Sequence, residues 1–192
     1  IPVLEHLAPR KDQRNSNVAF DVGPARASKD PSLKSVGITG QITGSRADEI
    51  LADDIESLNN SATEGSRENL LESIKEFDAV LKPDGTVTYL GTPQSFVSMY
   101  NKLPERGYSL RIWPARVPED ADAYLGRLAP YIHKLIDQGV AAGEPTDPAR
   151  FGHADLEKRA LSFGPSGFAL QFMLNTTLSD ANRFPLKLKD FV

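Results

Sequence analysis

The spacing of hydrophobic positions in residues 65–81 is the clearest structural signal in the chain. Apolar residues recur there every three or four positions, with charged residues largely between them, which predicts an amphipathic helix. The predicted apolar stripe consists of Leu70, Leu71, Ile74, Phe77 and Leu81. Ser61 and Glu64 have the spacing of a capping box just before this helix. Short apolar runs at residues 50–52 and 86–90 flank the helix, and both predict strands.

The pattern continues with a predicted short helix at residues 95–103 and a strand at residues 109–113, whose Trp113 is expected in the core. The predicted apolar side of the short helix consists of Phe96, Met99, Tyr100 and Leu103. The order strand, helix, strand, helix, strand favours an α/β fold with a mostly parallel sheet and helical crossovers. Two further short strands are predicted at residues 18–20 and 35–38.

Beyond Pro118 the chain becomes mainly helical. Residues 119–138 predict a helix that Pro130 either kinks or divides in two. The predicted apolar side of this segment consists of Leu125, Leu128, Ile132, Leu135 and Ile136. Residues 155–163 predict a charged helix, and residues 175–192 have the composition of a connection to another segment.

Composition and charge bound the possible functions. The chain has 192 residues and a formal net charge of −4, with acidic and basic residues interleaved, so its bulk charge does not mark a nucleic-acid surface. It lacks cysteine, which excludes disulfides and thiolate metal sites, and its three histidines are far apart in sequence. No apolar run approaches the ~20 residues that span a bilayer. Because the chain begins with Ile1 rather than Met, we expect a piece of a longer polypeptide.

Adjacent carboxylates follow the predicted strand at residues 50–52. Asp53 and Asp54 lie where the chain leaves the strand, so both side chains can reach one cleft although neighbours within a strand point to opposite faces. One carboxylate can then hold Mg²⁺ through its waters while the second polarises a water beside a nucleotide phosphate. The alternative interpretation is an aspartate that caps a helix after a strand, which is common.

The second predicted strand is followed by Gly91, Thr92, Pro93 and Gln94. Thr92 and Gln94 are candidates to sense a γ-phosphate or its attacking water, although an ordinary turn explains the same residues. Arg46 follows a glycine-rich loop and precedes the acidic strand. It either pairs with Asp48 or Glu49, or meets phosphate in its own subunit or in a neighbouring one.

A phosphate-binding loop is missing from the chain. The pattern G-x-x-x-x-G-K-[ST] does not occur, and the glycines of residues 37–44 are not accompanied by a lysine. We therefore expect the isolated chain to bind nucleotide poorly or not at all.

Motifs along nearly the whole chain resemble the large terminase subunit of T7-like bacteriophages, also called DNA maturase B. The resemblance rests on residues 35–48 leading into Ala52, Asp53 and Asp54, and on residues 60–63, 89–94, 106–108, 112–115, 146–148, 170–175 and 178–181. It implies a DNA-packaging motor, in which a P-loop ATPase domain of the RecA-like, additional-strand type drives double-stranded DNA into a procapsid. A C-terminal nuclease domain of the same parent protein cuts the DNA concatemer.

The resemblance also implies a domain organisation and partners. Residues 1–117 would be the C-terminal part of the ATPase domain, with Walker B and the coupling motif but without Walker A. Residues 118–192 would be a helical subdomain and linker toward an absent nuclease domain. The implied partners are double-stranded DNA, a portal protein, a small terminase subunit and further copies in a ring, with no membrane. The implied location is the cytoplasm of the infected bacterium rather than the mature virion.

Carried over by position, the resemblance assigns roles to the acidic residues, with ATP and Mg²⁺ as cofactors. Asp53 matches the Walker B aspartate that organises Mg²⁺. Asp54 occupies the place of the usual catalytic glutamate, and this departure leaves Glu56 as a rival for that role. Residues 92–94 match the coupling motif that links hydrolysis to movement, and Arg46 lies where terminases often have an arginine before Walker B.

Two alternatives from other functional classes stay open on the residues alone. A two-metal nuclease could use Asp53, Asp54 and Glu56, but it needs further carboxylates, such as Asp21 or Asp84, from other strands. A non-catalytic structural or interaction segment would use the acids only to cap a helix.

Overall fold

The computed structural model describes residues 2–40, 42–95 and 97–176, so Phe96 and the tail predicted as a connection lie, for the most part, outside the described residues. The chain divides into two compact units. The first comprises Ile1–Ala52 and Glu68–Tyr89, and the second comprises Asp53–Arg67 and Leu90–Val192. Helices and sheets are mixed along the sequence, so the chain is an α/β protein.

The first unit begins with a 3₁₀ helix, η1 (Pro2–Leu7), and a small antiparallel sheet. Strand β1 (Ala19–Phe20) pairs with β2 (Leu33–Lys34), so the strand predicted at residues 18–20 is confirmed. The strand predicted at residues 35–38 is wrong by two residues. Ser35 N still donates to Val18 O, just before β1, but Gly40 N donates to Gly37 O and turns the chain there.

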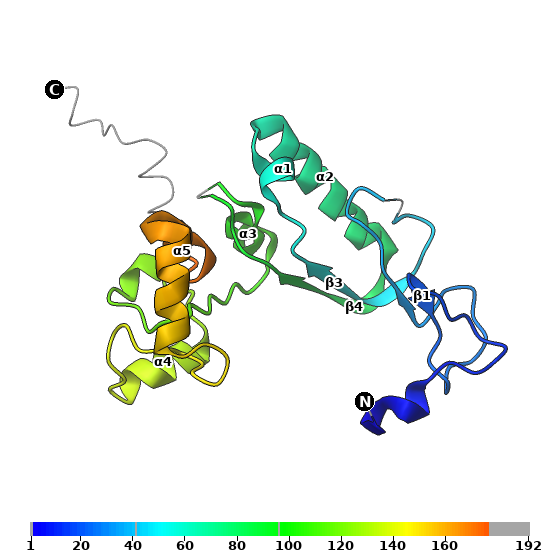
Figure 1. Cartoon of the computed structure of the whole chain (residues 1–192). Helices are drawn as coiled ribbons and strands as arrows, with labels where there is room; N and C mark the ends of the chain where they lie inside the picture. Colours follow the sequence, from blue (N-terminus) through cyan, green and yellow to red (C-terminus); the bar gives the residue numbers. More distant parts are fainter. Residues whose placement is uncertain (1, 41, 96, 177–192) are drawn as a thin grey trace. The chain divides into compact units, whose positions relative to one another are not determined.

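A parallel pair of strands follows, with a helix as the crossover (Figure 1). Strand β3 (Ala47–Asp53) pairs with β4 (Leu81–Leu90), and α2 (Glu64–Val80) connects them. Lys82 forms an ion pair of 2.8 Å with Asp48 near the start of both strands. At the other end, Asp54 N donates to Leu90 O at 2.9 Å, so the strands run in the same direction. The predicted strand, helix, strand order is confirmed.

Helix α2 buries three residues of the predicted stripe, Leu70, Ile74 and Phe77, whereas Leu81 already belongs to β4. Its buried residues are Leu70, Ile74, Phe77 and Val80. The Phe77 ring lies 6.0 Å from the ring of Tyr89 in β4, so the apolar face of the helix packs on the strand that it leads into.

The predicted capping box is wrong. A short helix, α1 (Leu58–Ser61), precedes α2, and its capping box is formed by Ser57 and Asn60. Ser61 is inside that helix, where its hydroxyl donates to Ser57 O. The start of α2 is instead held by Thr63, whose Oγ1 accepts from Ser66 N at 3.1 Å.

The second unit contains short helices rather than a third strand. After α3 (Met99–Lys102) and the 3₁₀ helix η2 (Leu103–Arg106), the strand predicted at residues 109–113 is absent from the described structure. Ile112 N donates to Arg127 O, and Ile112 O accepts from Ala129 N, so this backbone is already used by the chain just before α4. Trp113 is therefore not a core residue: it is 52% exposed and stacks on Tyr131 at 5.3 Å.

The helix predicted at residues 119–138 is broken. It contains the 3₁₀ helix η3 (Asp122–Tyr124) and α4 (Pro130–Asp137), separated by Leu125 and Gly126, both with positive φ. Leu125 is 72% exposed, so its predicted place on the apolar side is wrong. Pro130 is the first residue of α4, so the prediction that it divides the segment into two helices is confirmed.

Two clusters of side chains pack within the second unit. One is a buried cluster formed by Tyr124, Leu128, Ala129 and Ile132. The other lies at the end of α5 (His153–Gln171), the helix predicted at residues 155–163, which is broken at Gly164. There Phe172 stacks on Phe168 at 5.2 Å and meets the edges of Phe151 and Phe163.

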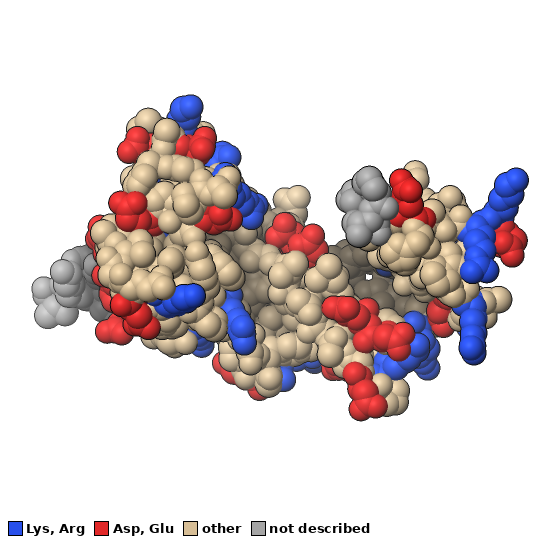
Figure 2. Space-filling model, turned by 90° about the horizontal axis from the view of Figure 1, so that it is seen from below, with Lys and Arg blue, Asp and Glu red and all other residues tan. Residues whose placement is uncertain are grey.

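Two surface properties agree with the composition. Positive and negative side chains are interspersed on the face that Figure 2 presents. None of the helices in the described part of the chain is long and apolar enough to cross a bilayer.

Candidate functional site

The exit from β3 is a sharp turn that presents the predicted acids. Asp53 is the last residue of the strand and is exposed. Asp54 has φ 43°, in the left-handed region that aspartate tolerates better than most residues. Its N–H donates to Leu90 O, so this turn lies beside the end of β4. Both acids are exposed at the neighbouring strand ends, as the strand-end interpretation requires.

Tyr100 braces the two strand ends. Its hydroxyl donates to Leu90 O at 3.3 Å and accepts from Glu56 N at 3.5 Å. A Cβ on Gly91 would lie 2.0 Å from that hydroxyl, so only glycine permits this approach. Burial raises the pKa of Tyr100 to about 12, with the nearby carboxylates of Glu56 and Asp54 adding to the shift, so the hydroxyl stays a donor at neutral pH.

The carboxylate of Glu56 is buried and fully engaged. Its Oε1 accepts from Gln94 N at 2.9 Å, and its Oε2 accepts from Ser98 Oγ at 3.0 Å and Met99 N at 2.7 Å. The residue is 3% exposed. Glu56 thus ties the loop after β3 to the start of α3 and to the segment after β4. Both oxygens are used as acceptors, which favours a structural role for this candidate.

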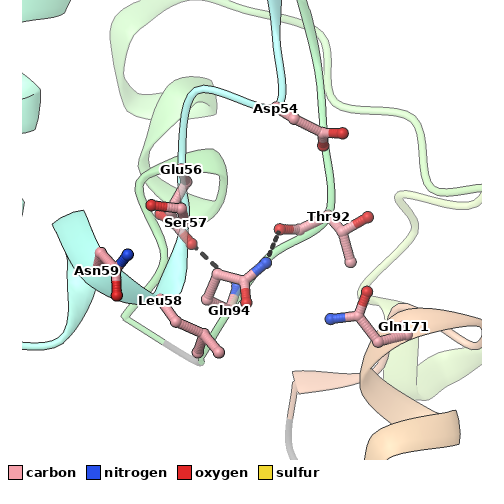
Figure 3. Close-up of a pocket in the computed structure, with 8 residues that line it drawn as sticks. All are labelled: Asp54, Glu56, Ser57, Leu58, Asn59, Thr92, Gln94 and Gln171. Carbon is pink, nitrogen blue, oxygen red and sulfur yellow. Dashed lines mark hydrogen bonds between the residues drawn. The ribbon is translucent and has the colours of Figure 1, made fainter. Parts of the chain in front are cut away.

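An open pocket lies where these segments meet (Figure 3). Its volume is about 490 Å³, and it is lined by Asp54, Glu56, Ser57, Leu58, Asn59, Thr92, Gln94 and Gln171. Four predicted site residues therefore share one cavity: Asp54, Glu56, Thr92 and Gln94. They come together because the parallel strands end at the same edge.

The remaining candidates lie elsewhere. Asp53 precedes the pocket residue Asp54 but is not part of the lining. Arg46 precedes β3, at the opposite end of the strand from Asp53, and its Nη1 donates to Ala79 O at 3.2 Å. The acid predicted as one possible partner of Arg46, Asp48, pairs with Lys82 instead.

Two glutamines line the pocket, Gln94 after β4 and Gln171 at the end of α5. Gln94 Nε2 donates to Thr92 O at 3.0 Å, which turns the amide back onto its own loop. Gln171, from the end of α5, was not predicted as a site residue. It lies in residues 170–175, one of the segments that carry the resemblance, but that segment does not reveal that tertiary packing brings Gln171 to the pocket.

The helix-cap interpretation of Asp54 is wrong. Helix α1 is capped by Ser57, so Asp54 is not an N-cap. Glu56, in contrast, accepts from the N-cap residue Ser98 and from Met99, the first residue of α3.

The two-metal interpretation has no support in the described residues. They contain no group of three or more acidic or histidine side chains placed to hold a metal ion. Asp84 lies near the start of β4, whereas Asp53 ends β3. Asp21 Oδ2 forms an ion pair with Arg14 Nε at 3.0 Å, and this hydrogen bond lowers the pKa of Asp21 from its usual value.

Together, the fold and the pocket define an α/β protein with a carboxylate-bearing cavity at the ends of two parallel strands. No family model matches the chain. Over its whole length the chain is 51% identical to the protein described as "Terminase, large subunit" from Enterobacteria phage T3. It spans 34% of that protein's length. The chain therefore matches, along its whole length, about a third of a terminase large subunit, which confirms the resemblance in the motifs.

Proposed function

We propose that this chain is part of a viral DNA-packaging motor that couples ATP hydrolysis to the translocation of double-stranded DNA into a procapsid. The observation that carries the proposal is the turn at Asp53 and Asp54. It lies beside the end of β4, and Asp54 shares a pocket with Thr92 and Gln94. Identity along the full chain to a terminase large subunit supports the same function.

The residues of the pocket suit a magnesium-bound triphosphate. Mg²⁺ prefers carboxylate oxygens and water, and Asp53 and Asp54 are both exposed, unlike Glu56. Apart from Glu56, whose carboxylate oxygens already accept three hydrogen bonds, the rest of the lining is neutral. The lysine loop that cradles phosphates is absent from this chain, so another segment of the whole protein would have to supply it.

In this proposal the chain's residues divide the work. Asp53 holds the cation, and a carboxylate oxygen of Asp54 accepts a hydrogen bond from the attacking water. Bound Mg²⁺ would neutralise charge on the phosphates. Thr92 and Gln94 follow the same strand edge and respond to the change at the terminal phosphate. Glu56 keeps that edge in register through its three hydrogen bonds.

The wider assembly is proposed by family membership. The P-loop, RecA-like form of the ATPase sheet and an endonuclease domain elsewhere in the parent protein belong to this proposal. So do the portal protein, the small terminase subunit, a ring of subunits and the bacterial cytoplasm as the place of action. Arg46 is exposed, which suits a phosphate contact in a neighbouring subunit.

The test uses the intact large subunit, with substitutions numbered as in this chain. Asp53→Ala and Asp54→Asn should each lower steady-state ATP turnover at least ~100-fold, because each removes charge stabilisation at the reacting phosphate. Asp54→Gly is the sharper variant, since glycine adopts φ 43° without strain and removes only the carboxylate. Asp137→Asn, on the exposed end of α4, is the matched control. Near-normal turnover in the Asp53 and Asp54 variants would rule out the assignment.

A further inference from the structure

Gln171 brings a side chain of α5 into the pocket. The other lining residues come from the ends of β3 and β4 and from α1 with the loop before it. In Figure 3 the Gln171 amide extends from the end of α5 toward Thr92 and Gln94. A neutral amide carries both a donor and an acceptor, so it can contact a phosphate oxygen and a water at the same time.

The backbone that carries Gln171 is firmly held. Its neighbour Phe172 packs against three other phenylalanines, and Phe172 O accepts from Ala115 N at 2.8 Å. Tyr124 donates from its hydroxyl to Met173 O at 2.7 Å. A side chain on such a support can be placed within the tolerance that catalysis needs.

The other glutamine of the pocket is less suited to this contact. Gln94 is tied by its backbone to Glu56 and by its side chain to Thr92. To reach a ligand, its amide would first have to break the bond to Thr92 O. The geometry therefore favours Gln171 as the amide that meets the reacting group.

Gln171 also lines a second cavity of about 480 Å³ in the same unit. Trp113, Arg150 and Phe172 are among the other residues of that cavity. Gln171 thus lies between two cavities of this unit.

We propose that Gln171 is a substrate-contacting residue of the ATPase reaction and the point at which α5 senses the nucleotide. Its Oε1 accepts a hydrogen bond from the attacking water, and its Nε2 donates to an oxygen of the terminal phosphate. This inference rests on the proposed function of the pocket. It adds the helical part of the chain to a site otherwise built from strand ends.

Steady-state ATPase kinetics of the intact large subunit test the proposal. Gln171→Met keeps the length and packing of the side chain but removes both hydrogen bonds. We expect kcat to fall about 10- to 100-fold while KM for ATP changes less than about threefold, the result of losing a contact made mainly in the transition state. Gln171→Glu places a negative charge beside the phosphate, so it should also raise KM. Gln138→Ala, at the exposed C-cap of α4, should leave both constants unchanged.

Hydrogen exchange separates sensing from simple packing. In the unsubstituted subunit, amides of residues 166–171 should be better protected with a non-hydrolysable ATP analogue than with ADP. Gln171→Met should abolish that difference without changing protection in the ADP state.

The outcomes distinguish this proposal from the function on which it rests. If Gln171→Met keeps normal kcat and the analogue-dependent protection while Asp54→Asn is inactive, Gln171 has no role and the ATPase assignment stands. If Asp54→Asn is fully active, the ATPase assignment itself fails. A Gln171→Met protein that loses protection equally in every nucleotide state would show a packing role only and would also overturn the proposal.

Discussion

The buried carboxylate of Glu56 gives a direct test of how the strand ends are held together. It accepts three hydrogen bonds, from Gln94 N, Ser98 Oγ and Met99 N, at 2.9, 3.0 and 2.7 Å. A buried donor that loses its acceptor costs about 1–3 kcal/mol. Glu56→Gln replaces one acceptor oxygen by a donor, so at least one of the three bonds is lost. We expect it to destabilise this region by about 1–3 kcal/mol.

Glu56→Ala should lower the stability further, because it leaves all three donors without an acceptor. Each unpaired donor costs about 1–3 kcal/mol, but the three penalties do not add fully and the surrounding loop relaxes, so we expect about 3–5 kcal/mol. Glu119→Gln, on the exposed surface, should change stability by less than about 0.5 kcal/mol.

Amide hydrogen exchange reads the effect where it arises. In Glu56→Gln, the amides of Gln94 and Met99 should exchange about 5- to 150-fold faster, the factor that corresponds to 1–3 kcal/mol at about 1.4 kcal/mol per tenfold change. Amides in α4, which do not touch Glu56, serve as the internal reference. Unchanged exchange at Gln94 and Met99 in both Glu56 variants would refute the reasoning that this carboxylate holds the site.

Two other features of the chain lead to measurable outcomes. Burial raises the pKa of Tyr100 and of Tyr124 to about 12, from 10.0. The folded state therefore holds these protons more tightly, and the stability they provide is complete below pH 10 and is lost as the pH rises toward 12. Urea denaturation between pH 8 and 11 should show this loss of unfolding free energy. Tyr100→Phe and Tyr124→Phe should each reduce the dependence of the unfolding free energy on pH. An unchanged pH dependence in both variants would contradict the raised tyrosine pKa values. Strand β3 exposes 60% of Leu51 and pairs, within the described residues, with β4 alone, so the 192-residue chain should self-associate in analytical ultracentrifugation. Leu51→Glu should weaken this association, whereas Leu161→Glu, at a residue 87% exposed on α5, should not; a monodisperse unsubstituted monomer would count against the idea.

The elements that could be predicted from the sequence are those with a strong local period. The stripe of α2 recurs at the spacing of a helix, and the apolar run at residues 50–52 falls within β3, so both elements lie where they were predicted, although β3 leaves Leu51 exposed. The prediction of a third strand at residues 109–113 was wrong. These residues have the composition of a strand, but Ile112 forms its backbone hydrogen bonds with residues on either side of Leu128. A local pattern cannot report which distant backbone will satisfy it.

The candidate site divides in the same way. Asp54, Thr92 and Gln94 were predictable because each follows a strand, and parallel strands bring their ends to one edge. The role of Glu56 was not, because its acceptors meet donors about forty positions away, at separations of 38, 42 and 43 residues. Gln171 lies in residues 170–175, one of the segments that carry the resemblance, but nothing in that segment places it at the pocket.

The sequence by itself determined the strand–helix–strand unit, the acids at its edge and the family, because these depend on periodicity and on residue identity along the chain. Only the tertiary structure decided that Asp54 is exposed at the cavity and that the Glu56 carboxylate is buried, where it holds neighbouring segments together by hydrogen bonds. The reason is that burial and hydrogen bonding depend on what packs against a side chain, and for Glu56 and Gln171 those neighbours are remote in sequence.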